Sequence, residues 1–141
     1  MIAAERGKEA EPMPTRLLVV DDEEDFLRSI VMRIELRGIE VHGVSSGEAA
    51  LEYLRQHPDK VDVILLDIKM PGIDGLETLR RIKDCCPSVE VIVVTGHGSQ
   101  EFSRIGRELG AFDYLIKPIR LDAILERIEA ATRAHRTSRG G

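Results

Sequence analysis

The stretch VDVILLDIKMPGIDG, residues 61–75, decides the fold of this chain. It opens with a short apolar run that is rich in branched side chains, which predicts a buried strand over residues 61–66. Asp67 follows this run directly, and the Pro and Gly residues after it predict a loop before the next helical pattern. A buried strand that ends in a carboxylate and leads into a helix is typical of a parallel α/β sheet.

The same alternation extends in both directions along the chain. Apolar runs predict strands over residues 17–20, 91–94 and 114–116, and an alternating segment predicts an edge strand over 40–44. Apolar residues at helical spacing predict a first helix that ends near residue 37, and further helices over 48–56, 76–85, 100–109 and 121–135. Because the connections are too long for hairpins, we predict a doubly wound α/β domain of three layers with five parallel strands.

Two of these helices carry recognisable end signals. Ser46 is the expected N-cap of the helix over 48–56, and Gly38 stands where a C-terminal cap of the first helix belongs. The helix over 100–109 is the weakest, because Gly106 inside it costs about 1 kcal/mol of helix propensity relative to Ala.

The chain of 141 residues, 43% of them hydrophobic, is long enough for one domain with a sizeable core. Residues 1–14 are rich in Glu, Ala and Pro without apolar periodicity and predict a disordered tail. We therefore predict one folded domain over residues 15–134 and a polar C-terminal tail over 135–141.

Charge and composition narrow the function classes. A formal net charge of −5 gives no basic footprint, so we predict no direct nucleic-acid binding. No apolar run approaches the roughly 18 residues of a membrane span, and the charged start does not fit a signal peptide. Cys85 and Cys86 are adjacent, which fits neither a CxxC metal motif nor an easily bridged pair. Reduced thiols favour a cytoplasmic protein.

Polar residues stand at the ends of four predicted strands. Asp21 and Asp22 follow the first strand, Asp67 the third, Thr95 the fourth, and the fifth runs into Lys117. Each alone has an ordinary explanation as a helix cap, a strand end or a solvated side chain. Because the carboxyl ends of parallel strands share one edge of the sheet, we expect all of them to converge on one crevice.

This set of residues favours a magnesium site that handles phosphoryl groups. Crowded carboxylates raise one another's pKa unless a cation shares the site, and ligands that are oxygens only favour the hard cation Mg²⁺. A carboxylate can serve as nucleophile, while an ammonium and a hydroxyl stabilise the transferred group. Asp67, at the end of the most apolar strand, is the predicted nucleophile.

Other phosphate chemistries lack their motifs. The sequence has no GxxxxGK[ST] loop for a nucleoside triphosphate and no GxGxxG loop for a dinucleotide. A hydrolase with an Asp nucleophile usually has a second carboxylate two residues later, where this chain has Lys69. That difference favours a protein that accepts a phosphoryl group and keeps it.

Over roughly residues 15–133 the sequence resembles the receiver domain of two-component response regulators. The resemblance rests on four motifs in family order: LLVVDDEED, VILLDIKMPGIDG, VIVVTGHGS and GAFDYLIKP. It implies a flavodoxin-like fold with strand order 2-1-3-4-5. It also implies a signalling domain rather than an enzyme with a free substrate, one that catalyses its own phosphorylation and dephosphorylation.

The resemblance assigns roles at the strand ends. It implies that Asp67 accepts the phosphoryl group of a phosphohistidine on a sensor histidine kinase or a phosphotransfer protein. Asp22, Asp67 and the backbone carbonyl of Lys69 would ligate Mg²⁺, and Asp21 would act through water or as outer support.

The remaining motif residues would form the switch. Lys117 would pair with the phosphoryl group, Thr95 would move to hydrogen-bond it, and Tyr114 would rotate inward behind Thr95. The helix over 100–109, the strand over 114–116 and the helix over 121–135 would then change as one surface, on which family members tend to dimerise. The peptide bond between Lys117 and Pro118 resembles the family's cis bond.

Two positions that tune phosphate lifetime in the family hold Lys69 and His97. Our hypothesis is that they shield or steady the phosphoryl group, and the equal alternative is that both project into solvent. His42, His57 and His135 are interpreted as surface residues without a role.

Four alternatives stay open at this stage. The chain can be a stand-alone receiver that binds a protein partner, or a piece of a longer transcription regulator, because VTGHGS and GAFDYLIKP are similar to receivers attached to enhancer-binding ATPase and helix-turn-helix modules. It can also be an autonomous Mg²⁺-dependent phosphatase, against which Lys69 argues, or an interaction module that works without phosphorylation.

Overall fold

The computed structural model describes residues 15–68, 75–96 and 100–140. Strands and helices alternate along them as follows: β1 (Arg16–Val20), α2 (Glu24–Glu35), β2 (Glu40–Val44), α3 (Gly47–Gln56), β3 (Val63–Leu66), α4 (Gly75–Cys85), β4 (Glu90–Thr95), α5 (Gln100–Glu108), β5 (Asp113–Ile116) and α6 (Leu121–Gly140). Every element predicted from the sequence is present, and most bounds agree within two residues.

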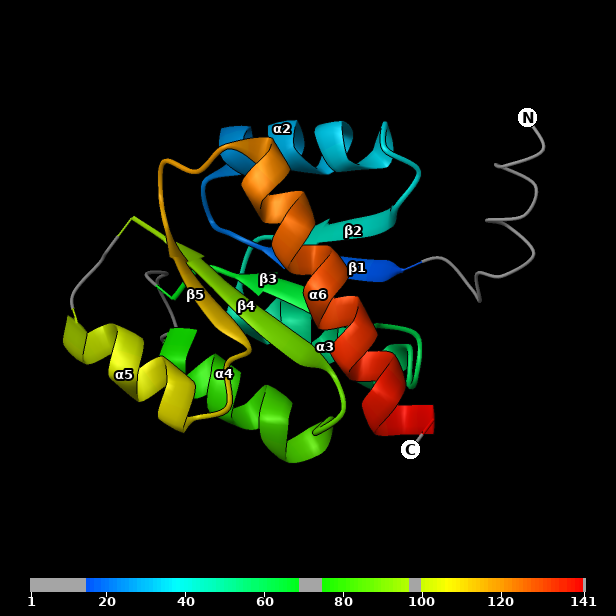
Figure 1. Cartoon of the computed structure of the whole chain (residues 1–141), viewed down its shortest axis with the longest axis vertical. Helices are drawn as coiled ribbons and strands as arrows, with labels where there is room; N and C mark the ends of the chain where they lie inside the picture. The colour runs from blue at the N-terminus through cyan, green and yellow to red at the C-terminus, as the bar shows by residue number, and fades with distance from the viewer. Residues whose placement is uncertain (1–14, 69–74, 97–99, 141) are drawn as a thin grey trace.

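The five strands form one parallel sheet in the order β2-β1-β3-β4-β5, which confirms the predicted fold class and strand order. Figure 1 shows the sheet between two layers of helices, with β2 and β5 at its edges. The central strands β1, β3 and β4 are apolar and buried almost throughout, because helices cover both of their faces.

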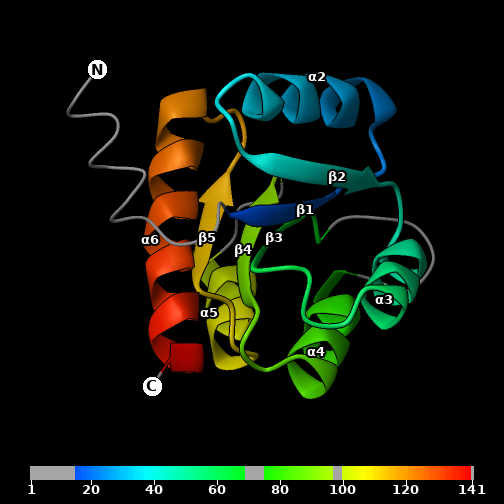
Figure 2. The ribbon, with the colours of Figure 1, turned by 90° about the vertical axis from the view of Figure 1, so that its right-hand side faces the viewer.

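Alternate side chains of the central strands point to opposite faces of the sheet and belong to two separate hydrophobic cores. The core under α2 and α6 contains Leu17, Val63 and Ile92, together with the residue two positions after each of them. Toward α3 and α4 point Leu18 and Ile64. Figure 2, turned by 90°, shows α2 and α6 on one side of the sheet and α3, α4 and α5 on the other. The doubly wound arrangement therefore follows directly from the period of two along buried strands.

The predicted end signals are present. Ser46 accepts a hydrogen bond from the backbone N–H of Ala49 at 3.0 Å, so it caps α3 as expected. Gly38 has a φ of +83°, and its backbone N–H donates to the carbonyl of Glu35, the last residue of α2. A residue with a side chain would be strained in that left-handed conformation.

The predicted end of the last helix is wrong. α6 does not give way to a polar tail near His135 but continues to Gly140. The reason is that its buried stripe continues past Ile128 through Ala131 and Thr132 to His135, which is only 3% exposed. His135 is therefore no surface residue, contrary to the prediction. Among the helices of the described residues, none combines the length and apolar character that a membrane span needs.

Candidate functional site

The polar residues predicted at the strand ends meet at the carboxyl edge of the sheet. Val20 of β1 lies opposite Leu66 of β3, so the residues that follow them, Asp21 and Asp67, are neighbours. The backbone N–H of Asp67 donates to the carbonyl of Val20 at 2.9 Å, which continues the ladder by one step. The fourth and fifth strands are joined in the same way, because the N–H of Lys117 donates to the carbonyl of Thr95 at 2.7 Å.

Three carboxylates gather at this edge. Asp21, Asp22 and Asp67 each offer an oxygen, and these oxygens lie within 4.8 Å of one another. Asp21 is 2% exposed and Asp67 is 6% exposed. Buried carboxylates this close together repel one another, and a hard divalent cation relieves that repulsion through oxygen ligands alone. The residues present therefore fit Mg²⁺.

Among the residues that the structure describes, the ammonium of Lys117, directly after β5, reaches across to these carboxylates. Lys117 Nζ lies 2.8 Å from Asp21 Oδ2, 3.1 Å from Glu23 Oε1 and 3.6 Å from Asp67 Oδ2. It also lies 4.1 Å from the centre of the Phe26 ring on α2, an arrangement that steadies a cation. In the described part of the site, Lys117 therefore faces several carboxylates, so these carboxylates outnumber the ammonium group.

The pKa directions at this site follow from burial first and from neighbouring charges second. Burial raises the pKa of Asp21, the Asp67 charge adds to that rise, and the hydrogen bond from Lys117 offsets it only in part. Burial would lower the pKa of Lys117, but its hydrogen bonds to Asp21 and Glu23 outweigh burial and raise it. Lys117 therefore carries a firm positive charge, while Asp21 is held ionised at a cost.

The two predicted switch residues are buried behind the carboxylates. Thr95, at the end of β4, is 0% exposed, and Tyr114 of β5 is 7% exposed within the core under α5. A Cβ at Gly106 would lie 3.4 Å from Tyr114 Cδ2, which is an ordinary van der Waals distance. The residue that weakens the helix in the sequence therefore faces the Tyr114 ring, and a small side chain would also fit there.

Part of the predicted site lies outside the described residues. These positions include Lys69, with the carbonyl expected to bind metal, and His97. The described residues on either side of the first gap meet closely, since Gly75 N–H donates to the Ile68 carbonyl at 3.1 Å. A Cβ at Gly75 would lie 1.9 Å from Ile68 Cα, so only glycine fits there.

Sequence reasoning missed two residues that contact Lys117. Glu23 pairs with its ammonium, and Phe26 lies beneath it. Glu23 belongs to the acidic run DDEED, where it could have been noticed. Phe26 carried only the signal of a helix core position. The Lys117–Pro118 peptide bond is cis in the structure.

Comparisons with known proteins agree with this geometry. The family described as the response regulator receiver domain matches residues 17–129. Response regulator MprA of Mycolicibacterium vanbaalenii is 34% identical over 121 residues, which cover 86% of this chain and 52% of that protein. Regulatory protein AtoC of Escherichia coli is 36% identical over 77% of this chain and 23% of its own length. The chain thus spans about half or less of these curated relatives.

Solved structures give the same answer. A CheY-like receiver domain protein from Methanospirillum hungatei superposes with a TM-score of 0.83 at 28% identity, covering 89% of this chain and 99% of that one. A receiver domain from Clostridium thermocellum has a TM-score of 0.80 at 34% identity, covering 84% and 94%. With the family match over most of its folded length, this chain belongs to the receiver domain family of two-component response regulators.

Proposed function

We propose that this receiver domain accepts a phosphoryl group on Asp67 in a Mg²⁺-dependent reaction. The observation that supports the proposal is the meeting of three carboxylates, Asp21, Asp22 and Asp67, with the ammonium of Lys117 at one edge of the sheet. The family to which the chain belongs supports the choice of phosphohistidine as donor.

In the proposed reaction, a carboxylate oxygen of Asp67 attacks the phosphorus atom of a phosphohistidine. A P–O bond to Asp67 forms as the P–N bond breaks, and the electron pair of the P–N bond stays on the ring nitrogen, so the protonated phosphohistidine ring leaves as neutral imidazole. Lys117, 3.6 Å from Asp67 Oδ2, is placed to pair with the charge of the transferred group. The product is an acyl phosphate on Asp67.

The metal would be held by Asp22 and Asp67, with Asp21 as outer support and the Lys69 carbonyl as a further ligand. When bound, Mg²⁺ neutralises the charge of the carboxylates and of the transferred phosphoryl oxygens. Burial of Asp67 limits the access of water, which favours retention of the phosphoryl group over its release.

We further propose that α5, β5 and α6 form the surface that responds. Thr95 would hydrogen-bond the phosphoryl group and Tyr114 would follow it. The position of Gly106 over the Tyr114 ring supports this route, since a movement of the ring would change how α5 packs against β5. Lys69 and His97 remain our candidates for tuning how long the phosphoryl group persists.

The partners belong to the same proposal. A sensor histidine kinase or phosphotransfer protein would supply the phosphoryl group, and an output domain or partner protein would receive the signal, with dimerisation on phosphorylation as one form of it. Free thiols at Cys85 and Cys86 fit a cytoplasmic setting for this exchange. MprA and AtoC, which are regulators longer than this chain, support a link to transcription.

The test is intact mass after incubation with acetyl phosphate, with and without Mg²⁺. Wild type should gain one phosphoryl group only with Mg²⁺, and Asp67→Ala should gain none. Asp113→Ala is the matched control, because Asp113 stands at the opposite end of the β5 strand and pairs with Arg127. A wild type that gains nothing while folded would contradict the proposal and leave an interaction module that works without phosphorylation.

The same samples separate a phosphoryl acceptor from a phosphatase. An acceptor keeps the phosphoryl group on Asp67, so its mass gain is visible and it releases little phosphate from an aryl phosphate. An autonomous phosphatase would release many equivalents from an aryl phosphate without a lasting gain in mass.

A further inference from the structure

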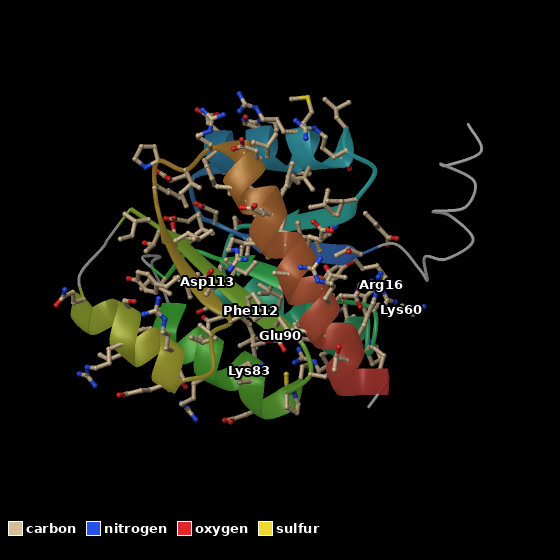
Figure 3. The ribbon with its side chains drawn as sticks, viewed as in Figure 1. Arg16, Lys60, Lys83, Glu90, Phe112 and Asp113 are labelled. Atoms are coloured by element: carbon tan, nitrogen blue, oxygen red, sulfur yellow. The ribbon has the colours of Figure 1, made fainter. Side chains whose placement is uncertain are left out.

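Cys85 and Cys86 place two thiols side by side on the surface. Their Sγ atoms lie 2.8 Å apart, Cys85 is exposed, and Cys86 is half-buried. Cys85 is the last residue of α4, two residues beyond Lys83, which Figure 3 labels on that helix. This pair lies far along α4 from Gly75, where the helix leaves the phosphoryl site, so it is not part of that site.

The two thiols face a cavity of about 510 Å³ between α3 and α4. Its apolar wall includes Leu51, Leu54, Val61 and Val89, and two arginines also line it. An apolar group of the size of a phenyl ring would find both volume and apolar contact there.

The backbone opposes a direct bond between the two sulfurs. Adjacent Cα atoms across a trans peptide are about 3.8 Å apart, whereas disulfides favour Cα separations of about 4.4–6.8 Å. The Cys86 N–H donates to the Ile82 carbonyl at 2.8 Å, and the Val89 N–H donates to the Cys86 carbonyl at 3.0 Å. Lys83 Nζ adds hydrogen bonds to the carbonyls of Pro87 and Val89. These hydrogen bonds hold the peptide between Cys85 and Cys86 in place. A ring in which a further atom bridges the two sulfurs therefore fits better than the smaller ring of a direct disulfide.

The surroundings also decide which atom can bridge the sulfurs. Structural zinc needs four protein ligands. Within the described part of the chain, only Asp21, Asp22 and Asp67 form a group of three or more potential metal ligands. The cysteine pair thus offers two sulfur ligands, which suit a soft, three-coordinate atom that already carries one substituent of its own.

We propose that Cys85 and Cys86 form a chelating site for an aryl-substituted trivalent arsenical, R–As=O, with the aryl group in the cavity between α3 and α4. The thiol of exposed Cys85 adds to arsenic first, and its proton passes to the oxygen. The thiol of Cys86 then attacks the arsenic atom and gives its proton to the As–OH group, which leaves as water. Two As–S bonds form, arsenic stays trivalent, and no oxidant or reductant is needed.

The protonation state of the second thiol agrees with this order. Burial, the hydrogen bond with Cys85 and the charge of Cys85 raise the pKa of Cys86 to about 12. Cys86 is therefore a poor independent nucleophile, and it reacts once Cys85 holds the arsenic beside it.

The test uses phenylarsine oxide and intact mass, and the background is clean because the chain has only two cysteines. Wild type should gain the mass of one phenylarsine oxide less one water. The adduct should survive washing with 2-mercaptoethanol, a monothiol, and be removed by dithiothreitol, a dithiol. Cys85→Ser is the decisive variant, since Cys85 is exposed and its replacement leaves the core untouched.

Two results would overturn the proposal. One is a wild-type adduct that the monothiol strips as readily as the dithiol, and the other is a Cys85→Ser adduct as durable as that of wild type. Circular dichroism of the variant confirms that it is folded, and Asp67→Asn should still form the adduct, since the two sites are separate.

The role of the cavity needs its own control. The peptide KDCCPS, residues 83–88, carries both thiols without the cavity. For the protein and for the peptide, the half-saturating concentration of inorganic arsenite is divided by that of phenylarsine oxide. This ratio should be at least about tenfold larger for the protein. Equal preference in protein and peptide would overturn the placement of the aryl group in the cavity.

Discussion

Asp21 and Asp62 are both almost fully buried, with 2% and 5% of their surface exposed. They lie at opposite ends of the strands, Asp21 at the carboxyl ends and Asp62 at the amino ends. Asp21 follows the end of β1, whereas Asp62 precedes the start of β3. In Figure 3 the label Arg16 marks the edge of the sheet where Asp62 lies, at the start of β1. The two carboxylates have opposite electrostatic surroundings.

Asp62 has hydrogen-bonding or ion-pairing partners on two sides, Arg16 and His135. Arg16 donates to it through Nη2 at 2.9 Å, Nε at 3.3 Å and its backbone N–H at 2.8 Å. His135 Nε2 from α6 lies 3.1 Å from Asp62 Oδ1, and its Nδ1 lies 2.6 Å from the Ser88 carbonyl oxygen. Burial would raise the pKa of Asp62, but the hydrogen bonds from Arg16 outweigh burial and lower it.

Asp21 instead shares one lysine with Glu23 and Asp67, and its pKa is raised. The contrast separates a structural carboxylate from a candidate functional one. Asp62 has partners that match its charge, and it links β1, β3 and α6. The carboxylates around Asp21 outnumber the lysine that pairs with them, which favours the binding of a cation or a reaction at that site.

The largest effect should come from removing the balanced carboxylate. Asp62→Asn leaves the Arg16 charge buried without its anion and should lower the free energy of unfolding by about 3 kcal/mol. The value lies at the low end for buried pairs because the Arg16 side chain keeps 25% exposure. Urea denaturation measures it.

Asp113→Asn is the matched control, since it also stands at the start of a strand and pairs with one exposed arginine, Arg127. We expect it to cost less than about 1 kcal/mol. Equal losses of unfolding free energy in the two variants would show that the burial and pairing of Asp62 add no stability beyond that of the more exposed Asp113–Arg127 pair.

The next effect concerns the unbalanced cluster and Mg²⁺. At a free Mg²⁺ concentration 100 times its Kd, binding should stabilise wild type by about 2.7 kcal/mol. Asp21→Asn should lose much of this gain yet be at least as stable as wild type in chelator, because it removes one of several repelling charges and leaves Lys117 paired with Glu23 and Asp67.

Exposed Asp25→Asn on α2 should keep the full stabilisation by Mg²⁺ and serves as the control. If Asp21→Asn were strongly destabilised in chelator, Asp21 would be a structural carboxylate like Asp62, and the comparison would fail.

The fold could be predicted from the sequence because its signals are local. The apolar runs of β1, β3 and β4 are buried on both faces, so each is continuous and easily recognised. The end of α6 could not be predicted, because residues beyond Ile128 carry little apolar signal. His135 is buried through its partners, Ser88 and Asp62, and these are distant in sequence.

The candidate site could be predicted for a similar reason. Strand ends of a parallel sheet converge, so Asp21, Asp67 and Lys117 were expected together before any distance was known. The Asp62 cluster at the other edge had only one weak signal, a carboxylate inside the apolar stretch VDVILL. Its partners come from β1 and α6, and only the tertiary structure reveals them.

A smaller effect should follow from loosening α6 at His135. His135→Gln removes one partner of Asp62 but leaves Arg16, so we expect a loss of about 1.5 kcal/mol in the free energy of unfolding. The control is Arg133→Gln on the same helix, an exposed residue paired with Glu129, which should change stability by no more than about 0.5 kcal/mol. If His135→Gln matched the control, the contact with Asp62 would contribute nothing to stability.

The smallest effect is the pH dependence of the Asp62 contribution. Because its folded-state pKa lies below the usual 3.8, the ionised carboxylate stabilises the native state above that pH, and this stability is lost as pH falls through the lowered pKa. Measured below about pH 5, the difference in unfolding free energy between wild type and Asp62→Asn should therefore shrink as the pH falls past about 4. Other carboxylates titrate in both proteins and cancel in the difference. A gap that widened toward acid would mean that native Asp62 holds its proton, and that its surroundings resemble those of Asp21 after all.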